Sequence, residues 1–329
     1  MIDVIYIEQS VRDHPRARAI VARFPAAQVI DCDHYGEIFN RHNQNFRAQK
    51  LRPALLLAEK IGRRILPVPD GYGLDGTDGY YFSHILNCLY DCRYCFLQGL
   101  FRSAHYVLFV NYEDFIADIS DLCAQSDKPQ WFFSGYDCDS LALEPISAFT
   151  DVFIAALNTI PNAWLELRSK STQIRSLLDR EPVSRVVCAF SLNPQPVIDR
   201  LEHRTPTLDA RLAALRKLQQ HGWPVALRFD PLILGEHFRR DYAAFFRHVF
   251  AQIDVDGVHS ITLGSFRAPR AHFRRMADLY PDEKLFAEAF DDRQGQIGYA
   301  AATEREMLAW CQQQLAPLAG SVPVYLQSA

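Results

Sequence analysis

Apolar and polar positions follow two alternating patterns from residue 80 onward. Short apolar or β-branched runs bounded by turn residues are typical of buried strands, and the longer amphipathic stretches between them indicate helices. The pattern predicts strands over Tyr81–Leu86, Trp131–Ser134, Trp164–Ser169, Val186–Ser191, Val225–Phe229 and His259–Leu263. It predicts helices over Tyr112–Gln125, Ser147–Asn158, Gln173–Arg180, Thr207–His221 and Phe238–Ile253. Repeated strand–helix units form a parallel sheet. We therefore expect an α/β fold, an open (β/α)6 barrel whose chemistry lies at the carboxyl ends of its strands.

The regions on either side of this barrel have less regular patterns. The first residues predict a strand, a helix, a second strand and a helical stretch, over Val4–Glu8, Arg16–Phe24, Gln28–Cys32 and residues 45–60. A turn-rich segment at residues 67–79 marks a boundary. The tail predicts a helix and a strand that brace the barrel, over Thr303–Gln314 and Val322–Leu326. We predict an N-terminal α/β region over 1–75, the barrel over 76–275 and a C-terminal extension over 276–329.

Composition places the chain among ordinary globular proteins. Hydrophobic residues make up 49% and charged residues 22%, and the formal net charge is −4. The chain as a whole is therefore no basic nucleic-acid binder, although a local basic face remains compatible with this charge. The N-terminus has no apolar run typical of a signal peptide, and no stretch approaches the roughly 20 apolar residues of a membrane span. We expect a cytoplasmic protein without a membrane partner; the oligomeric state stays open.

Three of the eight cysteines lie close together and need a chemical explanation. Cys88, Cys92 and Cys95 have the spacing C-x3-C-x2-C directly after a predicted strand. Three thiolates can hold three irons of a [4Fe-4S] cluster and leave the fourth iron open for a small ligand. A zinc site is the alternative, with His84 or His105 as a further ligand, but no second C-x2-C pair is present. The spacing is that of the radical S-adenosylmethionine (SAM) superfamily, which implies SAM as the ligand of the open iron.

Polar residues at the ends of the following strands are candidates for holding SAM. Ser134 and Gly135 end the second strand, where the superfamily has a glycine-rich turn; an ordinary turn is the alternative. Lys170 ends the third strand, in line with Glu166 and Arg168 on one face, and would pair with the SAM carboxylate. Ser191 and Asn193 end the fourth strand and suit ribose hydroxyls, or cap the next helix. Arg228 and Asp230 end the fifth strand and Arg267 follows the sixth; they are candidates for binding an anionic substrate, or for pairing with each other.

Over roughly residues 40 to 275 the chain resembles the spore photoproduct lyase family. The matching motifs are His42-Asn43-Gln44 with Arg47, the loop from Cys88 to Gln98 with Tyr94, Lys170, Ser191-Leu192-Asn193-Pro194, Glu202-His203 and Ala210-Arg211. The resemblance implies a lyase that reductively cleaves SAM to a 5′-deoxyadenosyl radical and repairs a thymine photodimer in DNA. It implies that Lys170 and Ser191 contact SAM and that Tyr94 lies at the cofactors and relays the radical. It also implies a flavodoxin- or ferredoxin-like electron donor as a partner.

The sequence departs from the family at the residues that return hydrogen to the product. The family's donor cysteine follows its second strand, where this chain has Tyr136, and Cys138 stands two residues later. A thiol S–H bond is weak enough to quench a carbon radical, so Cys138 is either a displaced donor or structural. Phe96 occupies the position of the family's second relay tyrosine and has no O–H. These departures keep open a radical SAM enzyme acting on a peptide, a modified nucleotide or a small metabolite.

A basic run follows the sixth strand and is a candidate for contacts with phosphate. It contains Arg267, Arg270, His272, Arg274 and Arg275. A DNA-lesion lyase needs such a surface because phosphate neutralisation supplies much of the affinity. The alternative is a solvated helix face.

Overall fold

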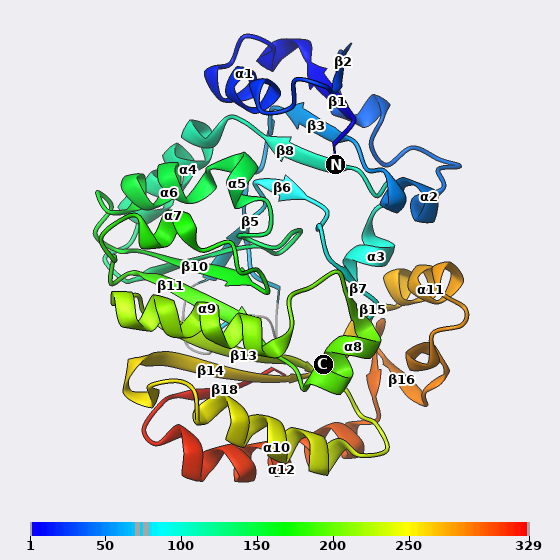
Figure 1. Cartoon of the computed structure of the whole chain (residues 1–329), viewed down its shortest axis with the longest axis vertical. Coiled ribbons are helices and arrows are strands. Elements are labelled where there is room, and N and C mark those ends of the chain that lie inside the picture. The colour runs from blue at the N-terminus through cyan, green and yellow to red at the C-terminus, as the bar shows by residue number, and fades with distance from the viewer. Residues whose placement is uncertain (1, 70–72, 75–78, 328–329) are drawn as a thin grey trace.

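The computed structural model describes residues 2–69, 73–74 and 79–327. Its largest sheet curls into an open half-barrel whose strands, within the described residues, have the order β18-β14-β13-β11-β10-β9-β5-β4 (Figure 1). Their bounds are β4 (Ile65–Pro67), β5 (Gly79–Phe82), β9 (Gln130–Ser134), β10 (Ala163–Ser169), β11 (Val186–Ser191), β13 (Val225–Leu232), β14 (Val258–Ser265) and β18 (Val324–Gln327). Each neighbouring pair runs parallel except β4 and β5. The predicted open α/β barrel is confirmed, and the predicted C-terminal strand extends its edge as β18.

Helices cover the outer face of this sheet, and the sequence of each strand explains why. Their bounds are α4 (Tyr112–Ala124), α6 (Phe149–Leu157), α7 (Arg175–Leu178), α9 (Leu208–His221), α10 (Phe238–Phe250) and α12 (Ala301–Ala319). In β11, Val186, Cys188 and Phe190 belong to the large core beneath the helices. The alternating Val187 and Ala189 belong to a smaller cluster with Trp131 and Phe133. Side chains buried on both faces explain why the barrel strands have continuous apolar runs.

A second sheet contains the N-terminal strands and has the order β2-β1-β3-β8-β6 within the described residues. Their bounds are β1 (Val4–Glu8), β2 (Gln28–Cys32), β3 (Leu55–Ala58), β6 (Ile85–Leu86) and β8 (Tyr106–Phe109), with α1 (Pro15–Ala22) packed beside them. The predicted helix over 45–60 is wrong in its second half, because α2 (Phe46–Leu51) ends before Pro53 and the chain continues as β3. Leu55–Ala58 is buried along its whole length, as an inner strand requires.

The two sheets meet at the strand that the sequence predicts over Tyr81–Leu86. The chain leaves the barrel after β5 and enters the N-terminal sheet at β6, which pairs antiparallel with β8. The N-terminal sheet therefore includes two strands, β6 and β8, that follow residue 75. Most of the turn-rich segment at 67–79 lies outside the described residues, and the domain boundaries stay a prediction. The cysteine loop follows this junction directly and lies between the two sheets.

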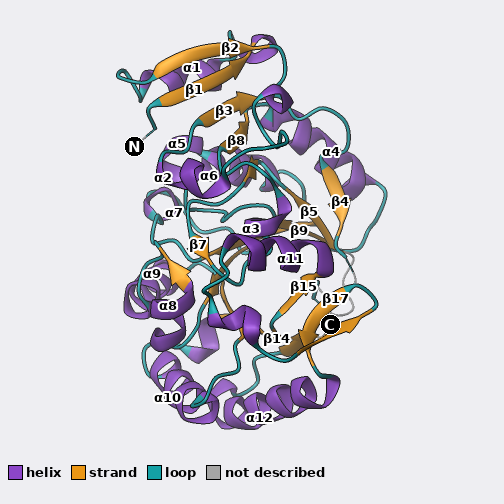
Figure 2. Ribbon diagram, turned by 90° about the vertical axis from the view of Figure 1, so that its right-hand side faces the viewer, coloured by secondary structure: helices purple, strands orange, loops and turns teal. Residues whose placement is uncertain are grey.

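The C-terminal extension adds a small antiparallel sheet, a helix beside the barrel and a final strand. Its elements before α12 are β15 (Arg267–Pro269), α11 (Arg270–Leu279), β16 (Phe290–Arg293) and β17 (Gln296–Tyr299). In Figure 2, α11 lies against α3 (Leu97–Leu100), the short helix that follows the cysteine loop. Among the described helices, none combines the length and the apolar character that crossing a bilayer requires.

Candidate active site

The cysteine loop begins at Asn87, directly after β6, and is fixed at both ends. Asn87 has a positive φ of 70°, and its side-chain amide donates to the carbonyl oxygens of Ser103 and His105, each at 2.7 Å. Farther on, β7 (Asp91–Cys92) pairs antiparallel with β12 (Glu202–His203). These backbone contacts hold the three cysteines beneath the carboxyl edge of the barrel.

Cys88, Cys92 and Cys95 fit an iron–sulfur cluster better than a zinc ion. All three line one cavity, and burial and the neighbouring thiolates raise the pKa of Cys88 and Cys92, so their thiolates need metal charge beside them. Within the described residues, no three His, Cys, Asp or Glu side chains surround a single ion. This arrangement suits a cubane, in which each thiolate binds a different iron.

The histidines proposed as zinc ligands serve the fold. His84 is fully buried and stacks on Phe149 with ring centroids 3.9 Å apart. Burial lowers the pKa of His84 to about 3, so its ring is neutral. In His105, Nδ1 accepts a hydrogen bond from the Ala54 amide at 3.0 Å. Neither side chain completes a tetrahedral site with the cysteines.

The cavity beside the thiols opens at the carboxyl ends of the barrel strands. Its volume, including the open mouth, is about 1190 Å³. The predicted residues that line it are Cys88, Cys92, Tyr94, Cys95, Ser134, Gly135, Tyr136, Cys138, Lys170, Ser191 and Arg267. Residues from at least five separate segments thus meet where a parallel sheet places its active site.

The SAM candidates at strand ends occupy different positions relative to this cavity. Lys170, after β10, lies with its Nζ 5.7 Å from the centre of the Tyr94 ring. Gly135, after β9, has a φ of 85°, and a Cβ there would lie 2.6 Å from Ser140 Oγ. That turn therefore requires glycine, because the turn packs closely against Ser140. Asn193 does not line the cavity; it is buried against Tyr242, whose hydroxyl donates to Asn193 Oδ1 at 3.1 Å.

Glu202 joins the cysteine loop to the following barrel segment, a role that the sequence reasoning missed. This buried carboxylate accepts hydrogen bonds from Tyr94 Oη, from Asn193 Nδ2 at 3.0 Å and from Arg211 at 2.5 Å. Arg211 is also fully buried. The network fixes Tyr94 at the thiols and holds Asn193 in place. In the sequence, only the Glu202-His203 and Ala210-Arg211 motifs indicated this network.

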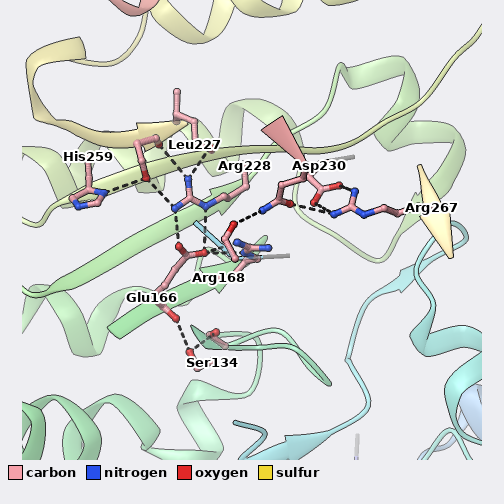
Figure 3. A network of polar contacts seen from close by, with 12 residues as sticks. Ser134, Glu166, Arg168, Leu227, Arg228, Asp230, His259 and Arg267 are labelled. Atoms are coloured by element: carbon pink, nitrogen blue, oxygen red, sulfur yellow. Dashed lines mark hydrogen bonds and ion pairs between the residues drawn. The ribbon is translucent and has the colours of Figure 1, made fainter. Parts of the chain in front are cut away.

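Arg228 lies in a buried ion-pair network and does not line the cavity (Figure 3). Arg228 and Glu166 are both fully buried and form a bond of 2.7 Å between Nη2 and Oε2. Glu166 also accepts from Arg168, whose side chain reaches the cavity. Burial alone would raise the pKa of Glu166, but the charges of Arg228 and Arg168 lower this pKa to about 2. Glu166, and not a substrate, therefore satisfies the charge of Arg228, which corrects its expected role.

Comparisons with known proteins agree with this geometry. The family model described as "Spore photoproduct lyase" matches residues 78–304. The chain belongs to the spore photoproduct lyase family. A spore photoproduct lyase of Bacillus subtilis is 26% identical over 86% of this chain and 83% of its own length. One from Clostridium acetobutylicum is 22% identical over 90% of this chain and 88% of its own.

Solved structures of spore photoproduct lyase share the fold of this family member. One, complexed with dinucleoside spore photoproduct, superposes with a TM-score of 0.87 at 17% identity and covers 99% of both chains. A mutant with bound AdoMet and dinucleoside spore photoproduct also has a TM-score of 0.87, at 17% identity, and covers 98% of both chains. The likeness confirms the radical SAM type of barrel.

The two departures from the spore photoproduct lyase pattern touch one another. Tyr136, from the turn after β9, packs against Phe96, from the cysteine loop, with ring centroids 5.5 Å apart. Tyr136 also packs against Tyr81, with ring centroids 4.2 Å apart and the rings tilted by 30°. A tyrosine ring is therefore in contact with the Phe96 ring, which has no hydroxyl of its own.

Cys138 lines the cavity and also belongs to the core of the N-terminal sheet. Burial, with the charges of Asp139 and Asp137, raises the pKa of Cys138 well above its usual value. The sulfur therefore keeps its hydrogen at neutral pH, as a hydrogen-atom donor must.

The basic run of this spore photoproduct lyase family member divides between buried contacts and an exposed helix face. Arg267 lines the cavity and pairs with Asp230 at 3.2 Å. Arg270 begins α11, pairs with Asp292 and does not line the cavity. Arg275 donates to the carbonyl oxygen of Gly99 at 3.0 Å. Arg274 is exposed. The helix thus presents part of its charge to solvent and part to α3.

Proposed function

We propose that this protein is a radical SAM lyase that repairs a thymine photodimer, the spore photoproduct, in DNA. The observation that carries the proposal is the meeting of three cysteine thiols, Lys170 and Ser191 around one cavity in a member of the spore photoproduct lyase family. When bound, the [4Fe-4S] cluster and SAM would supply radical chemistry, which begins with the one-electron cleavage of SAM. The chain's own residues must then hold SAM, place the lesion and return a hydrogen atom.

The cavity contains side chains suited to the cluster, to SAM and to the phosphate of the lesion. Cys88, Cys92 and Cys95 would hold the cluster. Lys170 would pair with the SAM carboxylate, and Ser191 would bond its ribose. Arg267 and Arg168, which also line the cavity, would face the phosphate of the lesion. The exposed charge of α11, with Arg270, would bind the neighbouring DNA backbone.

Hydrogen return is assigned to Cys138, with Tyr136 beside it on the same turn. The Cys138 thiol gives a hydrogen atom to the carbon radical of the product, which leaves the unpaired electron on sulfur. Tyr136 supplies, next to Phe96, the O–H that a relay through Phe96 would lack. This assignment makes the donor hydrogen exchangeable with solvent, because S–H and O–H protons exchange and C–H hydrogens do not.

The deciding experiment is an anaerobic assay with dinucleoside spore photoproduct, dithionite and SAM. The reconstituted enzyme should release thymidine products and form 5′-deoxyadenosine. Cys92→Ala should form neither, whereas the matched control Cys123→Ala, a buried cysteine of α4, should retain both. Formation of 5′-deoxyadenosine with an intact photoproduct would refute this substrate.

The hydrogen donor is tested by repeating the assay in D₂O. Deuterium should enter the repaired thymine of the wild type, and Cys138→Ala should abolish this label. Tyr136→Phe should slow repeated turnover while preserving the label in the first turnover. An unlabelled wild-type product, or full labelling in Cys138→Ala, would overturn the assignment to Cys138.

Two further features concern the setting of the reaction. The cluster needs a one-electron donor, for which a flavodoxin- or ferredoxin-like protein is suited. All eight cysteines are free, which agrees with a reducing compartment and thus with a cytoplasmic location.

A further inference from the structure

The cysteine loop has a second approach, on the side of α2. A smaller cavity, whose volume of about 330 Å³ includes its open mouth, is lined by all three cluster cysteines together with Phe46 and Lys50 of α2. No residue between 38 and 58 lines the larger, substrate-side cavity. The α2 side therefore reaches the thiols without crossing the site for SAM and the lesion.

Contacts hold α2 directly over the loop. Lys50 Nζ lies 2.8 Å from Asp91 Oδ1 and 3.4 Å from the carbonyl oxygen of Tyr90. Arg204, in the turn after β12, donates to the carbonyl oxygen of Lys50 at 2.9 Å. The end of α2, the loop and this turn thus form one continuous surface, which we call the α2 face.

The α2 face is basic in a chain that is acidic overall. The net charge of the whole chain is −4, yet residues 38–58 and 92–112 contain no Asp or Glu. Their basic residues are Arg41, Arg47, Lys50, Arg52, Arg93 and Arg102. Arg204 adds a further exposed charge beside Lys50. Asp91 pairs with Lys50 and Arg93, and Asp3 pairs with Arg52, so the basic residues outnumber their acidic partners and the face keeps a net positive charge. A net charge of this sign steers a partner of the opposite sign.

Two exposed leucines lie among these charges. Leu51, at the end of α2, is 75% exposed, and Leu89, inside the cysteine loop, is 37% exposed. Apolar side chains with a charged rim are typical of a protein-binding surface. DNA would gain little from exposed leucines on this side, since the lesion must enter the larger cavity.

We propose that the α2 face is the docking surface for an acidic one-electron carrier protein. The proposal rests on the proposed function only in requiring the cluster. One electron leaves the reduced carrier and enters the cluster held by the loop, so that the carrier is oxidised by one electron. The basic residues attract the carrier, and the exposed Leu51 and Leu89 give the apolar contact.

The test compares two charge-reversal variants of the holoenzyme. Arg47→Glu with Arg52→Glu changes two exposed residues of the α2 region, neither of which lines a cavity. The matched control is Arg239→Glu with Arg240→Glu on α10, at the opposite end of the molecule in Figure 1. The α2 variant loses one ion pair, that of Arg52, and the control loses two, those of Arg239 and Arg240, so the control is at least as strongly perturbed.

The probe is an acidic flavodoxin, reduced for kinetics and oxidised for binding. In the α2 variant we expect its affinity, and the rate of cluster reduction followed by EPR after rapid freezing, to fall on the order of tenfold. The wild-type rate should fall steeply with salt, and the variant's rate should depend on salt less. Cluster reduction by dithionite and DNA binding should be unchanged.

Either of two results would overturn the proposal. One is a flavodoxin affinity and reduction rate equal to those of the α10 control. The other is a parallel loss of DNA binding, which would assign the face to DNA. Because EPR and binding require no turnover, a failure of photoproduct repair would leave this test intact.

Discussion

The ion pair between Glu166 and Arg228 offers the sharpest test of how the barrel is held together. Both side chains are fully buried, and Arg228 also donates to Ser260 Oγ at 3.1 Å. Glu166→Gln keeps the shape but removes the charge. The buried guanidinium of Arg228 then has no counter-charge, which costs far more than losing a pair exposed to water.

The magnitude follows from the pKa of Glu166. It falls from an ordinary 4.5 to about 2 in the folded protein, and each pKa unit corresponds to about 1.4 kcal/mol, which gives about 3 kcal/mol. Breaking buried pairs generally costs about 3–5 kcal/mol. We expect Glu166→Gln to lower the free energy of unfolding of the apoprotein by this amount. Because the folded pKa is depressed, the contribution is complete above pH 4.5 and disappears as the pH falls toward 2.

Urea unfolding followed by far-UV circular dichroism measures the loss. Replacing both partners, Glu166→Met with Arg228→Met, should cost less than Glu166→Gln alone, because no buried charge then remains. Glu306→Gln, which breaks an exposed pair with Arg239, should change stability by less than about 1 kcal/mol. A loss in Glu166→Gln no larger than that of the exposed control would refute the reasoning.

Three further outcomes test the packing around the site. In Gly99→Ala, the added Cβ would lie 2.3 Å from the carbonyl oxygen of His272 on α11. The substitution should therefore lower the free energy of unfolding by about 1–3 kcal/mol and reduce the iron retained after reconstitution. A normal iron content would contradict this prediction. Tyr280→Phe removes a hydroxyl that lies 3.0 Å from Gln98 Oε1 and 3.3 Å from Asp91 Oδ1. Cluster loss in air should therefore quicken, and an unchanged rate would count against these contacts. Burial raises the pKa of Glu144 to about 7, so the folded state binds an extra proton and stability should fall by about 3 kcal/mol as pH rises from about 4.5 to 7. Glu144→Gln should flatten that slope in pH-dependent urea unfolding, and an equal slope in both proteins would exclude Glu144 as the cause.

The barrel was predictable because its strands carry their signal locally. Val186–Ser191 is bounded as the sequence predicts, since a run buried on both faces has no polar position inside it. Leu55–Ala58 was missed because four apolar residues beside a helical stretch have no period of their own, and only pairing with neighbouring strands decides their conformation. The strand over Tyr81–Leu86 was drawn as one element because nothing local shows that its two halves join different sheets.

The site was predictable to the extent that its chemistry lies in short motifs. The three cysteines occur within eight residues, so spacing alone indicates a cluster. Arg228 occupies a strand position from which it could face a substrate, and only the structure shows Glu166 62 residues away as its partner. Such long-range pairing leaves no trace in local periodicity.

The departures at Tyr136 and Phe96 show the same limit from the functional side. The sequence shows each difference from the family separately, 40 residues apart, and each alone suggests a lost function. The structure places the two rings in contact in the lining of one cavity, with Tyr81 tilted against Tyr136. The cysteine loop lacks a tyrosine at Phe96, and the turn after β9 supplies one at Tyr136, next to it. We therefore interpret the two differences from the family as a single change, in which the tyrosine has moved from one position to the other. Tyr136→Phe and Phe96→Tyr should therefore be combined, because a coupled exchange predicts that the second restores turnover lost through the first.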